Sequence, residues 1–293
     1  MERFILSCCS TADLTKEHFA DRNIHYICFH YFLDEKQYPD DLGQSMPFAE
    51  FYKAMENGAM TKTSQVNVAE YEEYFETFLK EGKDILHLCL SSGISGAYNS
   101  AMVAKNMLEE KYPDRKIYVV DSICAACGYG LLMDTLADLR DAGKSIDEVH
   151  QWAEENKGRV QHWFTATDLK YLIRGGRVSK ASGFVGTMLN ICPVLCVAPD
   201  GTLKAVQKVR TKKKVLEALA DKMAENVEDA DYADKCYIGH SACEEDARVL
   251  LRLIEERFPK LVGKILLGDI GTVIGSHTGP GTIVVCFWGK ERA

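Results

Sequence analysis

Short apolar runs alternate with longer amphipathic runs in the first half of the chain. Residues 3–9, 84–90 and 116–122 are rich in Ile, Leu, Val and Cys, which predicts strands. Residues 67–80 and 98–112 repeat apolar positions at helical spacing. Strand–helix–strand order of this kind predicts a mostly parallel sheet with crossover helices.

Two of the predicted helices begin with the pattern of a capping box. Asn67 is followed three residues later by Glu70, and Ser145 is followed by Glu148. In such a pair each side chain bonds the other residue's backbone N–H, so both patterns mark helix starts. The second helix runs to about Lys157, where we predict a domain boundary.

The second half of the chain combines hairpins with helices. Residues 193–210 form two alternating segments around Pro199-Asp200-Gly201, a turn sequence that predicts a hairpin. The remaining segments are strands at 163–168, 236–241, 264–271 and 282–288, and helices at 212–227 and 244–258. We therefore expect a two-lobed α/β protein with a ligand between the lobes. Residues 1–157 form a parallel α/β domain, and residues 158–293 form an α/β domain with an antiparallel or mixed sheet.

Composition narrows the possible partners and the compartment. The 293 residues carry a net charge of −8, which disfavours nucleic acid and anionic membranes as partners. No apolar run approaches the ~20 residues of a transmembrane helix. The start of the chain does not resemble a signal peptide, so a cytoplasmic protein is expected. The eleven cysteines are expected to be free thiols, since disulfides are rare in that compartment.

Hydroxyl groups and glycines gather where two helices are predicted to begin. Thr63 and Ser64 come just before one helix, while Ser92, Ser95 and Gly96 lie between a parallel strand and the next helix. Ligands bind at the carboxyl ends of such strands, and helix N-termini favour anions. The alternative is that these residues only cap the helices.

Two further segments carry candidate chemistry. Arg174 and Arg177 flank a glycine pair, and arginine is suited to clamp a carboxylate or phosphate. Residues 274–281 contain three glycines and a proline around His277, which predicts a loop that positions one titratable group. The alternatives are a solvated surface turn and a structural histidine.

Two weaker signals remain. Cys124 and Cys127 have the spacing of a thiol redox motif but lack its usual context. Zinc would need two further ligands, which His240 and Cys243 could supply in principle, although nothing in the spacing requires it. The basic run at 208–214, which includes Arg210, is either a solvated helix start or a docking site for an acidic partner or a phosphate.

Taken together, these segments resemble the DegV family of bacterial fatty-acid-binding proteins. The matching segments follow the family's order over nearly the whole chain. They are Ser10-Thr11-Ala12-Asp13-Leu14, Thr63-Ser64-Gln65, Ser92-Gly93-Ile94-Ser95-Gly96, Tyr171-Leu172 with Gly175-Gly176-Arg177, Leu189-Asn190 with Pro193, and Gly275 to Gly281.

The resemblance implies a fatty acid held between the two lobes. Thr63 and Ser95 match the hydroxyls that hold the acyl carboxylate, with the Gly96 N–H beside them, and His277 matches a histidine near that carboxylate. Arg177 matches the arginine of the family's Gly-Gly-Arg segment. The ligand-binding candidates are Thr63, Ser64, Ser92, Ser95, Gly96 and His277, and the candidates for a role in chemistry are His277, Arg177 and Arg210. The family presents its fatty acid to a separate ATP-dependent kinase that forms acyl phosphate, a step toward phospholipid synthesis.

The sequence departs from the family pattern, and other functions stay open. Cys9 stands where the family usually has aspartate, and Val66 stands where it usually has proline. One alternative is an enzyme acting on a small phosphorylated or carboxylated metabolite, with His277 as acid or base and Arg177 as clamp. Another is a thiol redox protein. No ATP-binding motif is visible, and no cofactor or metal is expected.

Overall fold

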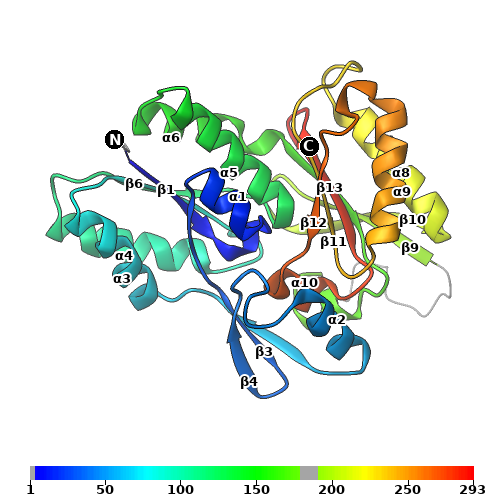
Figure 1. Cartoon of the computed structure of the whole chain (residues 1–293), viewed down its shortest axis with the longest axis horizontal. Helices are drawn as coiled ribbons and strands as arrows, with labels where there is room; N and C mark the ends of the chain where they lie inside the picture. Colours follow the sequence, from blue (N-terminus) through cyan, green and yellow to red (C-terminus); the bar gives the residue numbers. More distant parts are fainter. Residues whose placement is uncertain (1–3, 179–190) are drawn as a thin grey trace.

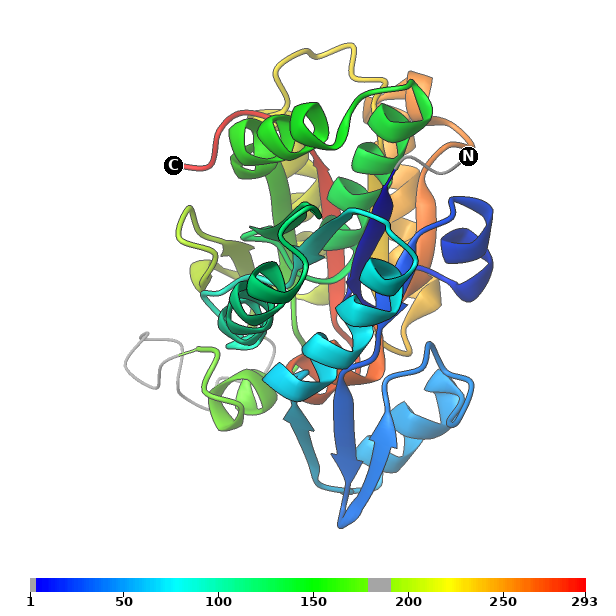
Figure 2. The ribbon, with the colours of Figure 1, turned by 90° about the vertical axis from the view of Figure 1, so that its left-hand side faces the viewer.

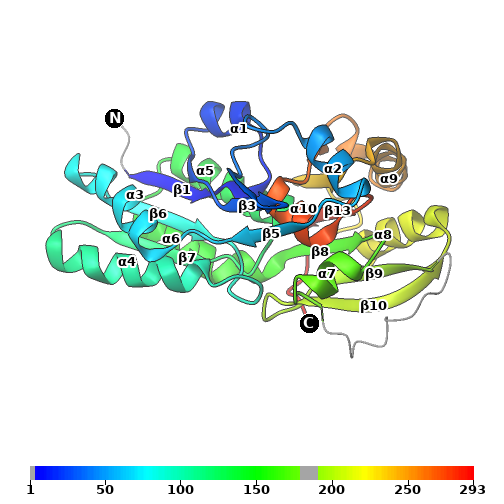
Figure 3. The same cartoon turned by 90° about the horizontal axis from the view of Figure 1, so that it is seen from below.

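The computed structural model describes residues 4–178 and 191–293. Its N-terminal part is built on a four-stranded parallel sheet in the order β2-β1-β6-β7, as the sequence predicts. The strands are β1 (Ile5–Cys9), β2 (His25–Ile27), β6 (Ile85–Cys89) and β7 (Ile117–Asp121). The helices of this part are α1 (Lys16–Asp21), α3 (Val68–Lys80), α4 (Ala97–Lys111) and α6 (Ile146–Asn156), with a 3-10 turn at Ser10–Ala12. Helices α3 and α4 pack on each other and on this sheet (Figure 3).

Both predicted capping boxes are present. The Asn67 side chain accepts a hydrogen bond from the Glu70 N–H at 3.1 Å, and the Glu70 carboxylate accepts one from the Asn67 N–H at 2.7 Å. Ser145 and Glu148 form the same reciprocal pair. These contacts satisfy N–H groups that have no partner within the helix, and they fix where α3 and α6 begin.

A small antiparallel sheet, in the order β4-β3-β5, projects from the body of the molecule (Figure 2). It comprises β3 (His30–Leu33), β4 (Lys36–Pro39) and β5 (Thr61–Ser64), and α2 (Phe48–Glu56) packs beside it. This unit was not predicted from the sequence. Its strands are short, and β5 reads Thr-Lys-Thr-Ser, which has none of the apolar alternation of a half-buried strand.

The C-terminal part contains a six-stranded mixed sheet in the order β10-β9-β8-β13-β11-β12. All neighbours in it are antiparallel except β11 and β12. The strands are β8 (Val160–Thr165), β9 (Ile191–Val197), β10 (Leu203–Arg210), β11 (Cys236–His240), β12 (Leu266–Asp269) and β13 (Ile283–Trp288). The helices are α7 (Lys170–Arg174), α8 (Lys212–Asn226), α9 (Glu244–Arg257) and α10 (Thr272–Thr278), with 3-10 turns at Lys157–Arg159 and Pro259–Leu261.

The two-domain α/β class with a mixed second sheet is confirmed, as is the predicted hairpin, whereas β8 begins three residues before the predicted 163. Of the matching segments, Leu189-Asn190 lies outside the described residues.

Helix α5 (Ala126–Asp141) lies between the two large sheets (Figure 1). It packs on β1 on one side and on β8, β11 and β13 on the other, so most of its residues are buried. A helix buried on several faces lacks an amphipathic stripe, which is why the sequence did not reveal it. The apolar core is continuous from the first sheet through α5 to the second. The boundary at residue 157 stays a prediction.

A buried ion network also joins the two parts. The carboxylate of Asp134 on α5 lies 3.0 Å from His18 Nε2 and 2.9 Å from Arg22 Nη1 on the N-terminal side. On the C-terminal side it contacts Lys235 and accepts a 2.9 Å bond from the Tyr237 hydroxyl. Burial alone would raise the pKa of Asp134, but these partners lower it well below its usual range, so the carboxylate is ionised.

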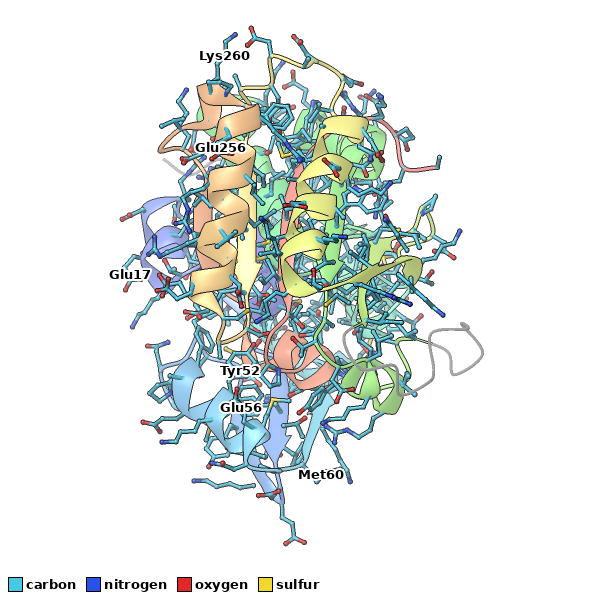
Figure 4. All side chains as sticks on the ribbon, turned by 90° about the vertical axis from the view of Figure 1, so that its right-hand side faces the viewer. Glu17, Tyr52, Glu56, Met60, Glu256 and Lys260 are labelled. Atoms are coloured by element: carbon cyan, nitrogen blue, oxygen red, sulfur yellow. The ribbon has the colours of Figure 1, made fainter. Side chains whose placement is uncertain are left out.

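The predicted loop at 274–281 is wrong in part, because Thr272–Thr278 forms helix α10. Buried contacts favour the helix despite its low intrinsic propensity. The Asp40 carboxylate accepts a 2.6 Å bond from the Thr272 hydroxyl at its start, and the Tyr52 hydroxyl donates to the Ile270 carbonyl at 2.6 Å. Figure 4 shows Tyr52 between α2 and α10. Of the three glycines in this segment, Gly275 lies inside the helix, whereas Gly279 ends it with a φ of 77°.

Candidate functional site

A cavity of about 340 Å³ lies where the N-terminal and C-terminal parts meet. This volume falls within the range of small-molecule sites, roughly 300–1,000 Å³. The wall is mostly apolar, and both parts contribute to it, among others through Leu90, Ile94, Phe164, Leu172, Val273 and Val284. The cavity therefore offers an apolar ligand a place away from water.

Polar side chains from four segments also line this cavity. They include Thr63, Ser64 and Gln65 at the end of β5, Ser95 before α4, Arg177 after α7, and His277 on α10. Figure 3 shows β5, α7 and α10 side by side. The fold thus gathers residues that are distant in sequence into one polar group.

Thr63 and His277 form the centre of this polar group. Thr63 Oγ1 lies 2.8 Å from His277 Nε2, a hydrogen bond between residues 214 positions apart. Burial, together with the nearby charges of Arg177 and Arg174, lowers the pKa of His277 to about 4, so the imidazole is neutral near pH 7. If Nε2 carries the hydrogen and donates to Thr63, the hydroxyl hydrogen of Thr63 is free for an anion.

The Nδ1 edge of the His277 ring lies against Gly175. A Cβ atom added at Gly175 would lie 2.2 Å from His277 Nδ1, so a side chain at position 175 would overlap the ring. His277 Nδ1 is buried and has no hydrogen-bond partner among the described residues. The first glycine of the pair thus provides the space that the imidazole occupies.

Arg177 connects the same glycine to the serine loop. Its Nε donates to the Ile94 carbonyl at 3.0 Å, and its Nη1 donates to the Gly175 carbonyl at 2.6 Å. Burial lowers the pKa of Arg177 but leaves it cationic. Within residues 4–178 and 191–293 it forms no ion pair, so its positive charge remains available to an anion in the cavity.

Ser95 occupies the turn that starts α4. Its Oγ accepts a 3.2 Å bond from the Ala97 N–H, which leaves the hydroxyl hydrogen able to donate to a ligand. The capping alternative and the binding interpretation are therefore compatible for this residue. A second contact closes the loop against the other lobe, because the Ser91 hydroxyl donates to the Gly201 carbonyl at 2.9 Å.

Three other candidates lie away from the cavity wall. Ser92 is exposed, and its N–H donates to the Asp121 carboxylate. Gly96 is exposed and is the N-cap residue of α4, and Arg210 is exposed at the end of β10. A Cβ atom at Gly96 would lie 2.6 Å from the Gln65 amide oxygen, so Gly96 accommodates a residue that does line the cavity.

Two polar residues that line the cavity, Gln65 and His162, were not predicted from the sequence. Gln65 stood in the polar triplet but was not singled out, and its amide donates to the Ser100 hydroxyl at 2.9 Å. His162, in β8, gave no signal. Its Nδ1–H donates to the Val160 carbonyl at 3.1 Å, because Nε2 accepts the Ala125 N–H at 3.3 Å. Burial lowers the pKa of His162 to about 3, so it is a neutral part of the wall.

The cysteine pair at 124 and 127 is not brought together as a redox motif. Cys124 Sγ lies 3.9 Å from the Lys157 carbonyl, whereas Cys127 Sγ lies 3.6 Å from Cys286 Sγ. In the described part of the chain, no three His, Cys, Asp or Glu side chains are grouped so as to hold a metal ion. Among its helices, none is long and apolar enough to cross a membrane.

Comparison with known proteins gives a consistent result over the whole chain. A family model described as "Uncharacterised protein, DegV family" matches residues 9–290. A DegV domain-containing protein of Clostridium perfringens is 40% identical over 292 residues, which cover 100% of this chain and 99% of the relative. A DegV domain-containing protein of Lactococcus lactis is 34% identical over 94% of both chains.

Solved structures of similar proteins contain the same fold. A DegV family protein from Ruminococcus gnavus, solved with vaccenic acid, is 28% identical, with a TM-score of 0.87 over 98% of this chain and 100% of that one. The fatty-acid-binding DegV family protein of Thermus thermophilus is 27% identical, with the same TM-score and coverage. With a family match over nearly its full length and a relative at 40% identity, the chain belongs to the DegV family.

Proposed function

We propose that this protein binds a long-chain fatty acid, with the carboxylate at the polar group of Thr63, Ser95 and His277. The observation that carries the proposal is the combination of a mostly apolar cavity with the Thr63 and Ser95 hydroxyls and the neutral His277 imidazole on its wall. The fatty acids bound by the Ruminococcus gnavus and Thermus thermophilus relatives support the same ligand class.

The acyl chain supplies most of the affinity in this proposal. Burial of ~15 methylenes at ~0.8 kcal/mol each is worth about 12 kcal/mol before the cost of association. The hydroxyls of Thr63 and Ser95 then fix which end of the acid faces the polar group. A hydrogen bond to a charged group is worth about 1.5–3 kcal/mol.

We further propose that the protein presents its fatty acid to a separate ATP-dependent kinase, which forms acyl phosphate. Thr63 and Ser95 are only half-buried, so the carboxylate end is the reachable end of the ligand. Arg177 would offset the charge that develops on the phosphoryl group. The exposed basic run at 208–214, with Arg210, is the proposed docking site for the kinase. Because ATP is the phosphate donor, the proposal implies a cytoplasmic protein.

Ligand binding is tested by mass spectrometry of material extracted from the purified protein, followed by uptake of a fluorescent fatty acid after delipidation. Near one long-chain fatty acid per chain is expected. Thr63→Ala and Ser95→Ala should each weaken binding about tenfold or more. Ser92→Ala is the matched control, because its side chain lies outside the cavity wall. A delipidated protein that takes up no fatty acid contradicts the proposal.

Presentation to a kinase is tested separately with His277→Ala. This variant should still bind fatty acid, because the apolar wall is unchanged, but it should support little acyl-phosphate formation with ATP and a cognate kinase. Turnover equal to wild type would make His277 a structural residue of α10. The alternative of a small polar metabolite as substrate fits the cavity less well, since most of its wall offers no hydrogen-bond partner.

A further inference from the structure

Two thiols from the two lobes meet just behind the cavity wall. Cys127 lies in the first turn of α5 and Cys286 lies in β13, and their sulfurs are 3.6 Å apart. Their exposed fractions are 2% and 0%. The sequence drew attention to Cys127 and Cys124, but the fold gives Cys127 a different partner, 159 positions away.

Both cysteines are neighbours of residues that line the cavity. Ala126, the neighbour of Cys127, lines the cavity, and so does Val284, which shares a sheet face with Cys286 because alternate residues of a strand point the same way. His162 also lines the cavity and is the register partner of Cys286 across β8 and β13. A Cβ atom at Gly128 would lie 2.1 Å from His162 Nε2 and 2.8 Å from Cys286 Sγ, so α5 presses directly on this part of the wall.

We propose that Cys127 and Cys286 are an oxidation site, reached through the cavity, whose disulfide joins α5 to β13. The oxidant is a hydroperoxide. One thiolate attacks the O–O bond and becomes a sulfenic acid, and the leaving oxygen departs as hydroxide from hydrogen peroxide or as alkoxide from an alkyl hydroperoxide. Protonation then converts the hydroxide to water or the alkoxide to an alcohol. The second sulfur displaces the sulfenic oxygen as water and forms the S–S bond, so two electrons pass from the thiols to the peroxide.

Three features are expected to slow this oxidation: the separation of the sulfurs, the burial of Cys286 and a ligand in the cavity. The sulfurs must approach from 3.6 Å to the ~2.05 Å of a disulfide, which requires the two side chains, or the elements that carry them, to move. Burial raises the pKa of Cys286, so its thiolate is scarce. An acyl chain in the cavity would exclude the peroxide, and the filled protein should therefore resist oxidation. This last step alone depends on the proposed function.

The test uses the delipidated, reduced, full-length protein treated with hydrogen peroxide. Remaining thiols are blocked with N-ethylmaleimide under denaturing conditions, and the digest is analysed by mass spectrometry without reduction. A linked peptide pair containing Cys127 and Cys286, two hydrogen atoms lighter than the separate peptides, is expected. Dithiothreitol should remove it. Cys127→Ser should abolish the link, whereas Cys124→Ser should retain it.

Other results overturn the proposal. A Cys124–Cys127 link would reinstate the motif that the sequence suggested, and reduced Cys127 and Cys286 beside oxidised surface thiols would show that the pair is not reached. Protein saturated with oleic acid should form the link at least severalfold more slowly, and equal rates would refute access through the cavity. If the protein binds no fatty acid at all, the link in the delipidated protein still tests the thiol pair by itself. Circular dichroism of each variant confirms that it is folded.

Discussion

Replacing Gly175 with alanine should move His277 without damaging the backbone. The new methyl carbon would lie 2.2 Å from Nδ1, about 0.8 Å inside the 3.0 Å limit of real Cβ contacts. Gly175 has a φ of −73°, which any residue adopts, so alanine adds no backbone strain. The imidazole must therefore shift, and its 2.8 Å bond to Thr63 must lengthen or break.

The size of the effect depends on which step is measured. A lost neutral hydrogen bond is worth about 0.5–1.5 kcal/mol, so fatty-acid affinity should fall only about two- to tenfold. A displacement near 1 Å costs about 100-fold in a reaction that needs precise positioning. Acyl-phosphate formation with the cognate kinase should therefore fall much further than binding.

The matched control is the neighbouring glycine. Gly176 has a φ of 74°, and a Cβ atom there would meet nothing within 4 Å. Gly176→Ala should cost about 1–2 kcal/mol of stability but leave the His277 ring in place. Binding is measured by fluorescent fatty-acid titration, and the ring environment by NMR of the imidazole nitrogens. Unchanged imidazole signals and wild-type turnover in Gly175→Ala would refute the steric argument.

Two predictions concern the dependence of stability on pH. Asp134 is ionised in the folded protein by a lowered pKa, so its contribution is complete above the unfolded value of ~3.9 and is lost as the pH falls further. Asp134→Asn should cost roughly 1.5–3 kcal/mol at pH 7, and the difference from wild type in urea unfolding should shrink at acid pH, whereas a constant difference would contradict the ionised state. Burial lowers the pKa of His87, His162 and His277 to about 3, 3 and 4, so the unfolded chain takes up protons first below pH ~6.5. As the pH is lowered from 6 to 4, each of these histidines should reduce the free energy of unfolding by up to ~1.4 kcal/mol per pH unit. A urea midpoint that stays constant over that interval would show that the rings are protonated in the folded state.

Several helix starts and the hairpin turn could be predicted because they are specified by residues close together in the sequence. The capping pairs at Asn67 and Ser145, and the turn at Gly201, specify nearby hydrogen bonds, and the structure contains them. Helix α5 could not be predicted in this way. Its burial depends on two sheets that come together only in the folded protein, so its sequence carries no single apolar stripe.

The candidate site, like the fold, could be predicted from the sequence only in part. Thr63 and Ser95 precede helices, and the polar character of those positions was visible. His277 was noticed, but its helix was not, since α10 depends on contacts with Asp40 and Tyr52 from the other end of the chain. The role of Gly175 as a space for the imidazole, and the place of His162 in the wall, required the three-dimensional neighbours.

The hydrogen bond between Thr63 and His277 also affects the order of events during synthesis. At roughly 5–20 residues per second, a ribosome needs about 10–40 s to add the 214 residues that separate the two partners. During that time the nascent N-terminal part exposes its half of an apolar wall with no opposite half to cover it. Under the proposed function, a fatty acid can be enclosed by both halves of the wall only after the last strand, β13, has been made, because Val284 of that strand lines the cavity.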